Sequence, residues 1–261
     1  MLLLPSTLDN IVAFVKTSAK AKRPRLEICP YGTVTLIAPR RFSARHWQGF
    51  LRDNTGWITQ TLERIDHHRR QAPQLHTIQP GVIHLPAVGA TWHIDYSNQQ
   101  RRGAIESQIE GGQRLTVRAG DNHEHLKHLN AWVRARAHAV LPTRLREISE
   151  QTELRFSRIN IRAQKTRWGS CTRSGTISLN QNLLFLSPEL ADYLMIHELC
   201  HTVHMSHSAR YWTLVKRFSP DYRLHESRLR HAANQVPLWA AGARQRTAQP
   251  GDTVIRLTMP I

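Results

Sequence analysis

The chain has 261 residues, of which 40% are hydrophobic and 21% are charged. This length and composition suffice for one sizeable core or two modest ones, and they exclude a disordered chain, a collagen and a small disulfide-stabilised scaffold. The net charge of +17 comes from 30 Arg and 6 Lys against 19 Asp and Glu, which favours a polyanionic partner such as nucleic acid, although such an excess also serves as a solubilising surface.

The first 120 residues have the pattern of β structure with one helical region. Short apolar or alternating segments around a turn at Tyr31 and Gly32 predict a small antiparallel sheet. Ser43 can cap a helix near residues 44–69, whose apolar stripe includes Trp47 and Trp57, and the Asn54-Thr55-Gly56 interruption could divide it into two helices. More alternating segments separated by glycine turns follow, so we expect a β-rich N-terminal region over residues 1–120. The predicted strands are 11–15, 26–28, 34–37, 82–85, 91–96, 104–109 and 114–117.

The pattern changes near Gly120, where we expect a domain boundary. Asp121 followed by Glu124 is a capping-box pattern, and apolar residues at helical spacing continue to about Leu154. The fold class is therefore predicted to be α+β, with a second domain over residues 121–235 and a C-terminal tail over 236–261. The remaining predicted elements are strands at 156–163 and 176–180, a turn at 168–171, and helices beginning at Pro188, Ala209 and Tyr222.

The helix that begins at Pro188 carries a metal-binding pattern. It contains the sequence His-Glu-Leu-Cys-His at residues 197–201, and the four-residue spacing places both imidazoles on one face, one turn apart. Two neutral histidine nitrogens at this spacing can bind one Zn²⁺, with Glu198 in reach of a metal-bound water rather than of the metal. If the two histidines bound no metal and were buried on this otherwise apolar helix, their ring nitrogens would lack hydrogen-bond partners. We therefore predict a zinc site that includes His197 and His201.

A third ligand has two candidates, His207 and His204. His207 follows His201 by six residues, which is the spacing of zinc peptidases in which the chain leaves the helix and turns back. His204 stands where that class has glycine, so the turn either holds a strained left-handed residue or follows another path. His204 could itself be a ligand, but it would then share a continuous helix with the other two over almost two turns. The spacing favours His207.

We expect a soluble, cytoplasmic protein with no membrane partner. No apolar run approaches the roughly 20 residues that a membrane helix needs, and the first residues lack the pattern of a signal peptide. The three cysteines, Cys29, Cys171 and Cys200, are far apart in the sequence, which predicts reduced thiols. No pattern in the sequence predicts an oligomeric state.

The segment from 167 to 212 contains a block of specific motifs: Arg167-Trp168-Gly169-Ser170-Cys171, Ile177-Ser178-Leu179-Asn180, Pro188, Asp192-Tyr193, residues 197–201 and His207-Ser208-x-x-Tyr211-Trp212. This block resembles the YgjP-like family (DUF45) of metal-dependent hydrolases, which are described as metallopeptidases and are related to the Wss1-like and SprT-like zinc peptidases. Residues 15–39 and the helix around Gly56-Trp57-Ile58 also resemble the start of this family, so the resemblance covers most of the chain, whereas residues 67–120 and the tail after about 235 match poorly. The resemblance implies a zincin-like catalytic domain, in which a long helix packs on a small sheet and a metal-binding helix follows, with Trp168, Ser170 and Cys171 beside the cleft.

These patterns predict a zinc metallopeptidase that acts on a peptide or protein. Three imidazoles leave zinc one position for water, and Glu198 would take the proton of that water and pass it to the leaving amine. Tyr211, His204 and Arg167 are candidates to stabilise the oxyanion, although each also has an ordinary structural role. In zincins the sheet edge that corresponds to Thr176–Asn180 pairs with an extended peptide.

Two other classes of function remain open at the level of the sequence. With 30 Arg, the chain could be a metal-dependent nucleotide pyrophosphohydrolase assisted by Mg²⁺ or Mn²⁺, although three histidines favour zinc. It could also be a nucleic-acid-associated module with a metal site, since Trp47, Trp57 and Trp92 have basic neighbours. Helical periodicity assigns the first two of these tryptophans to a core stripe.

Overall fold

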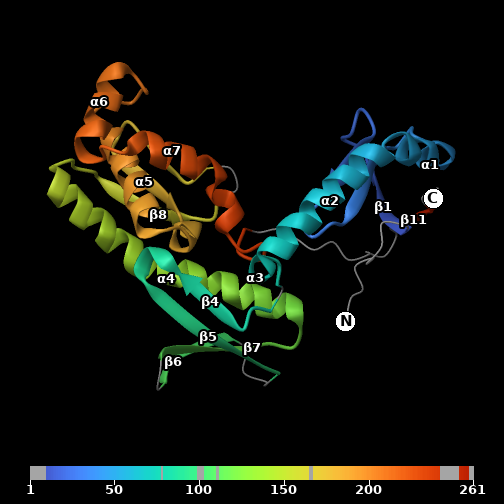
Figure 1. The fold of residues 1–261 in the computed structure, drawn as a ribbon, viewed down its shortest axis with the longest axis horizontal. Coiled ribbons are helices and arrows are strands. Elements are labelled where there is room, and N and C mark those ends of the chain that lie inside the picture. Colours follow the sequence, from blue (N-terminus) through green and yellow to red (C-terminus); the bar gives the residue numbers. More distant parts are fainter. Residues whose placement is uncertain are drawn as a thin grey trace. The chain divides into compact units, whose positions relative to one another are not determined.

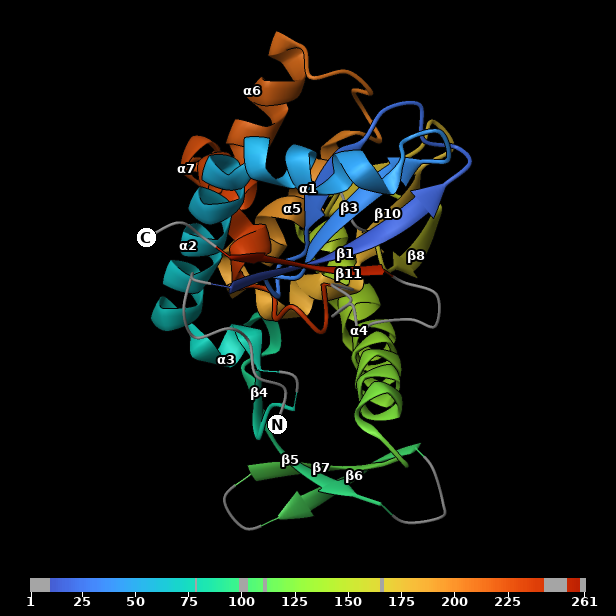
Figure 2. The same ribbon diagram turned by 90° about the vertical axis from the view of Figure 1, so that its right-hand side faces the viewer.

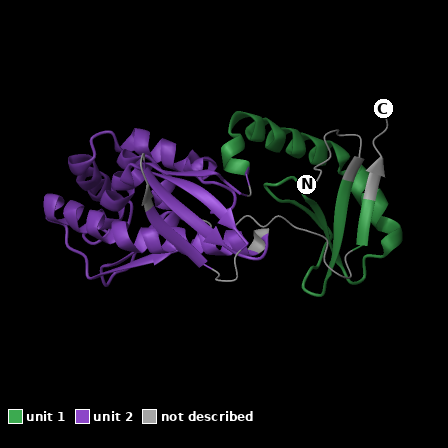
Figure 3. Cartoon of the chain, turned by 90° about the horizontal axis from the view of Figure 1, so that it is seen from below, with its two compact units in different colours: residues 1–76, 243–261 green, residues 77–242 purple. Residues whose placement is uncertain are grey.

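A computed structural model describes residues 10–77, 79–98, 103–109, 112–164, 167–241 and 253–258. It is a mixed α+β protein whose chain forms two compact units, unit 1 with residues 1–76 and 243–261 and unit 2 with residues 77–242 (Figure 3). Within the described ranges, no helix combines the length and the apolar character needed to span a bilayer.

Unit 1 contains a four-stranded sheet in the order β11-β1-β3-β2. β2 and β3 form a hairpin around Gly32, where φ is +83°, and β1 lies on the other side of β3 and runs parallel to it. The predicted all-antiparallel sheet is therefore wrong, because alternation of side chains specifies a face and carries no information on strand direction. The strands are β1 (Asn10–Ser18), β2 (Arg25–Ile28), β3 (Val34–Pro39) and β11 (Thr253–Thr258).

Helices pack on one face of this sheet through an apolar core of their own. The predicted helix at 44–69 is two helices separated at Asn54, and Leu51 and Ile58, one from each, are fully buried against the sheet. Trp47 is partly buried there, but Trp57 is 47% exposed, so its assignment to the core stripe is wrong. Trp57 precedes the buried Ile58 by one residue, about 100° around α2, and therefore lies off the buried face. The helices are α1 (Ala44–Asp53), α2 (Thr55–Gln71) and α3 (Pro73–His76).

Unit 2 begins with a second four-stranded sheet, in the order β4-β5-β7-β6, which lies along the long helix α4 (Asn122–Thr152) (Figures 1 and 2). Trp92 of this sheet packs edge-on against Trp132 of α4 with 5.1 Å between the ring centroids. One continuous core therefore joins the sheet to the helix, and the chain divides near residue 76 rather than near Gly120 as expected. The strands are β4 (Val82–Leu85), β5 (Ala90–Ser97), β6 (Gly103–Ile109) and β7 (Gly112–Arg118).

The rest of unit 2 surrounds one apolar helix, α5 (Pro188–Cys200). The capping box at the start of α4 is present, since Asp121 Oδ1 accepts from the Glu124 amide at 2.8 Å and Glu124 Oε2 accepts from the Gly120 amide at 2.9 Å. The predicted turn at 168–171 is a short strand, and the sheet order is β8-β10-β9. The other elements are β8 (Arg158–Arg162), β9 (Gly169–Cys171), β10 (Thr176–Asn180), α6 (Ala209–Phe218), α7 (Tyr222–His231) and three short 3₁₀ helices, η1 (Pro86–Val88), η2 (Gln181–Phe185) and η3 (Ala232–Gln235).

The segment predicted to be a C-terminal tail belongs to both units. Val236 and Trp239 are buried in the core of unit 2, where the Trp239 ring meets Phe185 edge-on at 5.9 Å. β11 is paired antiparallel with β1 in unit 1, with Ala13 opposite Ile255. Sequence periodicity missed these contacts because their partners lie far away along the chain.

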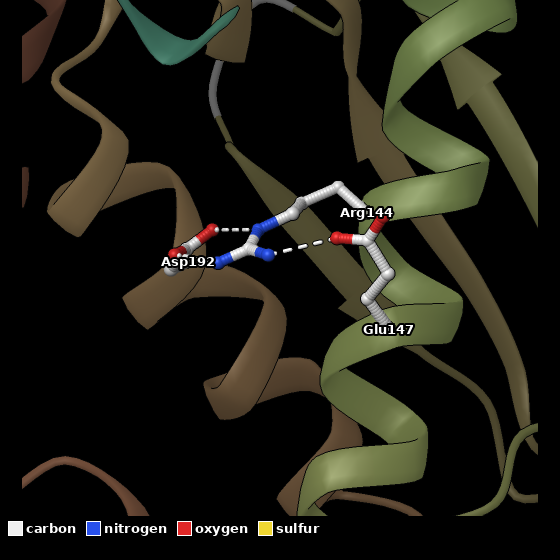
Figure 4. A network of polar contacts seen from close by, with 3 residues as sticks. All are labelled: Arg144, Glu147 and Asp192. Carbon is white, nitrogen blue, oxygen red and sulfur yellow. Dashed lines mark hydrogen bonds and ion pairs between the residues drawn. The ribbon is translucent and has the colours of Figure 1, made fainter.

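A charged network links α5 to α4 (Figure 4). The Arg144 guanidinium donates from Nε to Asp192 Oδ1 at 2.9 Å and from Nη2 to Asp192 Oδ2 at 2.6 Å, and from Nη1 to Glu147 Oε2 at 2.8 Å. Such a two-pronged contact defines orientation as well as distance. It therefore supports the position of the helix that carries the metal-binding pattern.

Candidate metal site

The site is built on the second half of α5, which is buried on most of its surface. Ser187 is extended and Pro188 is the first helical residue, so the helix begins where the sequence predicts. Leu194, Met195 and Leu199 lie in the core of unit 2. Because these apolar residues fix the rotation of α5, they also fix the directions of His197 and His201, which share a face one turn apart, and of Glu198, which lies about 100° from His197.

Three histidines converge at this side. His197, His201 and His207 offer nitrogen atoms that all lie within 4.8 Å of one another, a grouping that could hold a metal ion. Their ring centroids are 5.0 Å (197 and 201), 5.2 Å (197 and 207) and 4.7 Å (201 and 207) apart. His197 Nε2 and His207 Nε2 are only 3.3 Å apart. The group contains no carboxylate, so its chemistry is that of nitrogen donors.

Neighbouring groups orient the rings. His201 Nδ1 donates to the backbone carbonyl of His204 at 3.1 Å, which leaves its Nε2 as the unprotonated nitrogen. Tyr211 stacks on the His201 ring at 4.5 Å and donates its hydroxyl proton to the His197 carbonyl at 3.1 Å. Trp212 stacks on the exposed His207 ring at 5.5 Å. Hydrogen bonding and stacking of this kind define ring orientation in metal sites.

The turn between His201 and His207 follows a path that needs no glycine. The amides of Thr202 and His204 donate to the carbonyls of Leu199 and Cys200, which tightens the end of the helix. Among the described residues, Glu153 is the one non-glycine residue with a positive φ, so His204 carries no left-handed strain. The turn therefore follows another path instead of holding a strained left-handed residue at His204. The backbone carbonyl of His204 accepts the hydrogen bond from His201 Nδ1.

The two histidines of α5 are neutral in this environment. Burial, together with the smaller effects of the nearby His201 and His207 rings, lowers the pKa of His197 to about 3. Burial also lowers the pKa of His201, against the effect of its hydrogen bond to the His204 carbonyl. Neutral imidazoles have the lone pair that a metal needs, so these shifts suit a metal ligand.

Glu198 directly follows His197 on α5, and its side chain lies in a confined position. Its side chain is 4% exposed, and its Oε2 has no hydrogen-bond partner among the described residues. Burial raises its pKa to about 8, and the positive charge of Arg167 acts in the opposite direction. A Cβ atom placed on Gly169 of β9 would be 2.6 Å from Glu198 Oε1. The Glu198 carboxylate therefore occupies space that exists only because residue 169 is glycine.

The other predicted site residues lie around this group in different environments. Trp168 packs partly buried against the core of unit 2, and Arg167 is exposed, with its carbonyl accepting from Asn180 Nδ2 at 3.0 Å. Burial and the nearby Glu198 raise the pKa of the Cys171 thiol to about 11, which keeps the thiol protonated at neutral pH. Tyr211 is fully buried, and its hydroxyl group donates a hydrogen bond to the His197 carbonyl.

Two contributors were missed by sequence reasoning. Gly169 was quoted only as part of a motif, although a glycine inside a strand often marks a close approach by another group, and that signal could have found it. The other is Glu226 of α7, whose Oε2 accepts from the hydroxyl of the buried Tyr193 at 2.6 Å, while the Tyr193 ring meets His197 edge-on at 6.1 Å. Nothing local predicts a contact between residues 33 positions apart.

Comparison with known proteins adds a family to this geometry. The crystal structure of the metallopeptidase zymogen of Pyrococcus abyssi abylysin is 23% identical over 37% of this chain and 98% of that chain, with a TM-score of 0.34, which does not establish a shared fold. No curated protein matched the sequence significantly. The family described as YgjP-like, metallopeptidase domain matches residues 22–232, including residues 67–120 that resemble it poorly by motif. The match spans most of the chain, and this protein therefore belongs to the YgjP-like metallopeptidase-domain family.

Proposed function

We propose that this protein is a zinc-dependent peptidase of zincin-like architecture, with His197, His201 and His207 as metal ligands and Glu198 as the general base. Membership of a metallopeptidase-domain family supports a metal-dependent peptidase. The observation that carries the finer proposal is the convergence of three histidine nitrogens within 4.8 Å beside one buried carboxylate with an unpartnered oxygen.

The residues present fit a zinc ion. His201 has its Nδ1 proton engaged by a carbonyl, and the lowered pKa values of His197 and His201 keep both rings neutral. Three imidazole donors without a carboxylate are a typical set for catalytic zinc and an unusual one for Mg²⁺ or Ca²⁺, which prefer oxygen. When bound, zinc would supply a Lewis acid that polarises the substrate carbonyl and lowers the pKa of a water molecule.

Glu198 would move the proton in this reaction. A carboxylate with a raised pKa can accept a proton from water near neutral pH and give it to the departing amine nitrogen. Gly169 and the surrounding core hold the carboxylate in place, so that it does not need to reorganise. Arg167 is the exposed cation beside it and is available to the developing oxyanion, whereas the Tyr211 hydroxyl already donates to the His197 carbonyl.

An extended peptide would pair with β9, rather than with the predicted strand 176–180. That strand, β10, is paired with β8 on one side and with β9 on the other, so its backbone N–H and C=O groups already bond to neighbouring strands. β9 is an edge strand, and its Trp168 carbonyl and Thr172 amide bond to β10. Since backbone groups alternate along a strand, those of Gly169 and Cys171 point to the open edge. Recognition through this edge would tolerate many substrate sequences.

The test is metal content and peptide cleavage measured on three variants. Glu198→Gln is expected to retain zinc and to lose at least about 1,000-fold in kcat, because it removes the base alone. His207→Ala is expected to lose zinc, and His204→Ala is its matched control, since only the carbonyl of residue 204 is used. Release of pyrophosphate from nucleoside triphosphates without peptide cleavage, or zinc lost equally in both His variants, would contradict the proposal.

A further inference from the structure

Unit 1 gathers positive charge at one end of its sheet. Residues 10–77 contain twelve Lys and Arg against four Asp and Glu, whereas residues 121–241 contain seventeen against ten. Between residues 10 and 45 there are eight cations and a single acid, Glu27. The excess of positive charge per residue is therefore highest in the first part of the sequence.

The strand register brings these cations together. β1 and β3 are parallel, with Ser18 opposite Pro39, so the segments that follow both strands leave the sheet at the same end. β2 starts at this end too, because it is antiparallel to β3 and Arg25 lies opposite Ile37. The connection at 19–24 joins the two strands that flank β3, and it therefore passes the point where residues 40–43 leave the sheet.

We call this region the basic end, and it consists of Lys20, Lys22, Arg23, Arg40, Arg41 and Arg45. All six of these side chains are exposed. Lys16 and Arg25, which lie within the sheet on either side of Ile37, are exposed as well. Glu27 is bound to Arg25 at 3.1 Å, which leaves the six cations with no carboxylate from this part of the chain. α1 begins here without an acidic residue in its first turn, so the positive end of its dipole adds to the positive field.

We propose that the basic end binds the phosphate backbone of a nucleic acid. Polar, strongly positive surfaces are typical of protein–nucleic acid interfaces. An interface with an acidic protein normally has an apolar centre, and a membrane surface is bound through apolar side chains as well as charge. The large apolar side chains exposed in the described part of unit 1 are Trp57, which lies on α2, and Val254, which lies opposite Phe14 on the edge strand β11. A purely cationic surface favours repeated phosphates over both alternatives.

The experiment measures binding of the full chain to a short fluorescent oligothymidylate and to a duplex DNA by anisotropy. The charge variant combines Lys20→Gln, Lys22→Gln, Arg23→Gln, Arg40→Gln and Arg41→Gln. Its matched control removes five exposed cations of α6 and α7, by Lys216→Gln, Arg217→Gln, Arg223→Gln, Arg228→Gln and Arg230→Gln. Circular dichroism and cleavage of a small peptide verify that both variants remain folded.

The wild-type protein is expected to bind with an affinity that falls steeply between about 50 and 200 mM salt. The charge variant should bind at least about tenfold more weakly, and its salt slope on the single strand should be smaller by about 3, since each phosphate contact contributes about 0.7. The control should change affinity by less than about threefold, and Glu198→Gln should bind as the wild type does, which separates this proposal from the proposed function. Absence of wild-type binding or equal losses in the two variants would overturn it. So would displacement of the DNA by polyglutamate or by phosphatidylserine vesicles at equal charge.

Discussion

The candidate metal site has two halves that are positioned by different forces. His197, His201 and Glu198 lie on α5, whose rotation is fixed by a buried core and by contacts with α4, α6, α7 and β9 among other elements of unit 2. His207 lies in an exposed segment, and its orientation comes from ring stacking on Trp212. The comparison shows that core packing fixes the positions of Glu198, His197 and His201, whereas the position of the His207 ring can adjust. Changes on the α5 side should therefore act on the rate, and changes on the His207 side should act on metal affinity.

Among changes to the residues that support the ligands and the base, the largest expected effect is that of Gly169→Ala on the packed half. A methyl group at residue 169 would be 2.6 Å from Glu198 Oε1, so the carboxylate must move. We expect kcat to fall by about 100-fold or more, because a displacement of about 1 Å can have that effect, while zinc content stays unchanged. Steady-state peptide cleavage and metal analysis of the same preparation measure both quantities.

Ser170→Ala is the matched control for this change. Residue 170 is the next residue of β9, and its side chain points to the opposite face of the strand. A wild-type rate in Gly169→Ala, or an equal loss of rate in Ser170→Ala, would show that the close approach to Glu198 does not matter for the reaction.

The packed half is also the part of the site that sequence alone predicts best. The spacing of His197 and His201, the start of the helix at Pro188 and the apolar character of α5 are all local features, and local features determine helix phase. The choice of His207 as third ligand remains a prediction, made from spacing, and the structure places its ring beside the other two.

Features that depend on distant pairing were beyond sequence reasoning. The parallel pairing of β1 with β3, the buried position of Trp239 and the hydrogen bond between Tyr193 and Glu226 each join residues with no periodic relation. Trp57 shows a failure of another kind: Leu51 and Ile58 share the buried face, whereas Trp57 lies about 100° from Ile58 on α2 and is exposed, so the predicted apolar stripe was too wide. Sequence patterns therefore predicted most elements and the centre of the site, but neither the division into units nor the support around the site.

Trp212→Leu is expected to have the next largest effect, on the adjustable half. The leucine removes the stacked surface that orients His207, without touching α5. Zinc affinity should fall by about tenfold, as is usual when a group that orients a ligand is lost, with kcat at saturating zinc nearly unchanged. Competition against a chromophoric chelator measures the affinity. Trp212→Phe keeps an aromatic surface and should lose less, so equal losses would argue against stacking as the cause.

Tyr211→Phe should have a smaller effect, and it distinguishes two roles for this residue. Its hydroxyl donates to the His197 carbonyl, and loss of one such bond should lower the free energy of unfolding by about 1 kcal/mol. Stacking on His201 would persist, so kcat should change by less than about threefold. Urea unfolding and cleavage rates provide the two measurements. A rate loss of about 100-fold with unchanged stability would instead assign the hydroxyl to the oxyanion.

The smallest expected effect is that of Asp192→Asn on the link between α5 and α4. The Arg144 and Asp192 side chains are 42% and 28% exposed, so water and salt screen much of their attraction. We expect the free energy of unfolding to fall by about 0.5–1 kcal/mol at low salt and by less at high salt, even though the contact is two-pronged. A double-mutant cycle with Arg144→Gln isolates the coupling from the contact of Arg144 with Glu147. Because the apolar core fixes α5 independently, kcat should stay at the wild-type value, and a large loss of rate in Asp192→Asn would mean that this ion pair, rather than packing, sets the position of the catalytic helix.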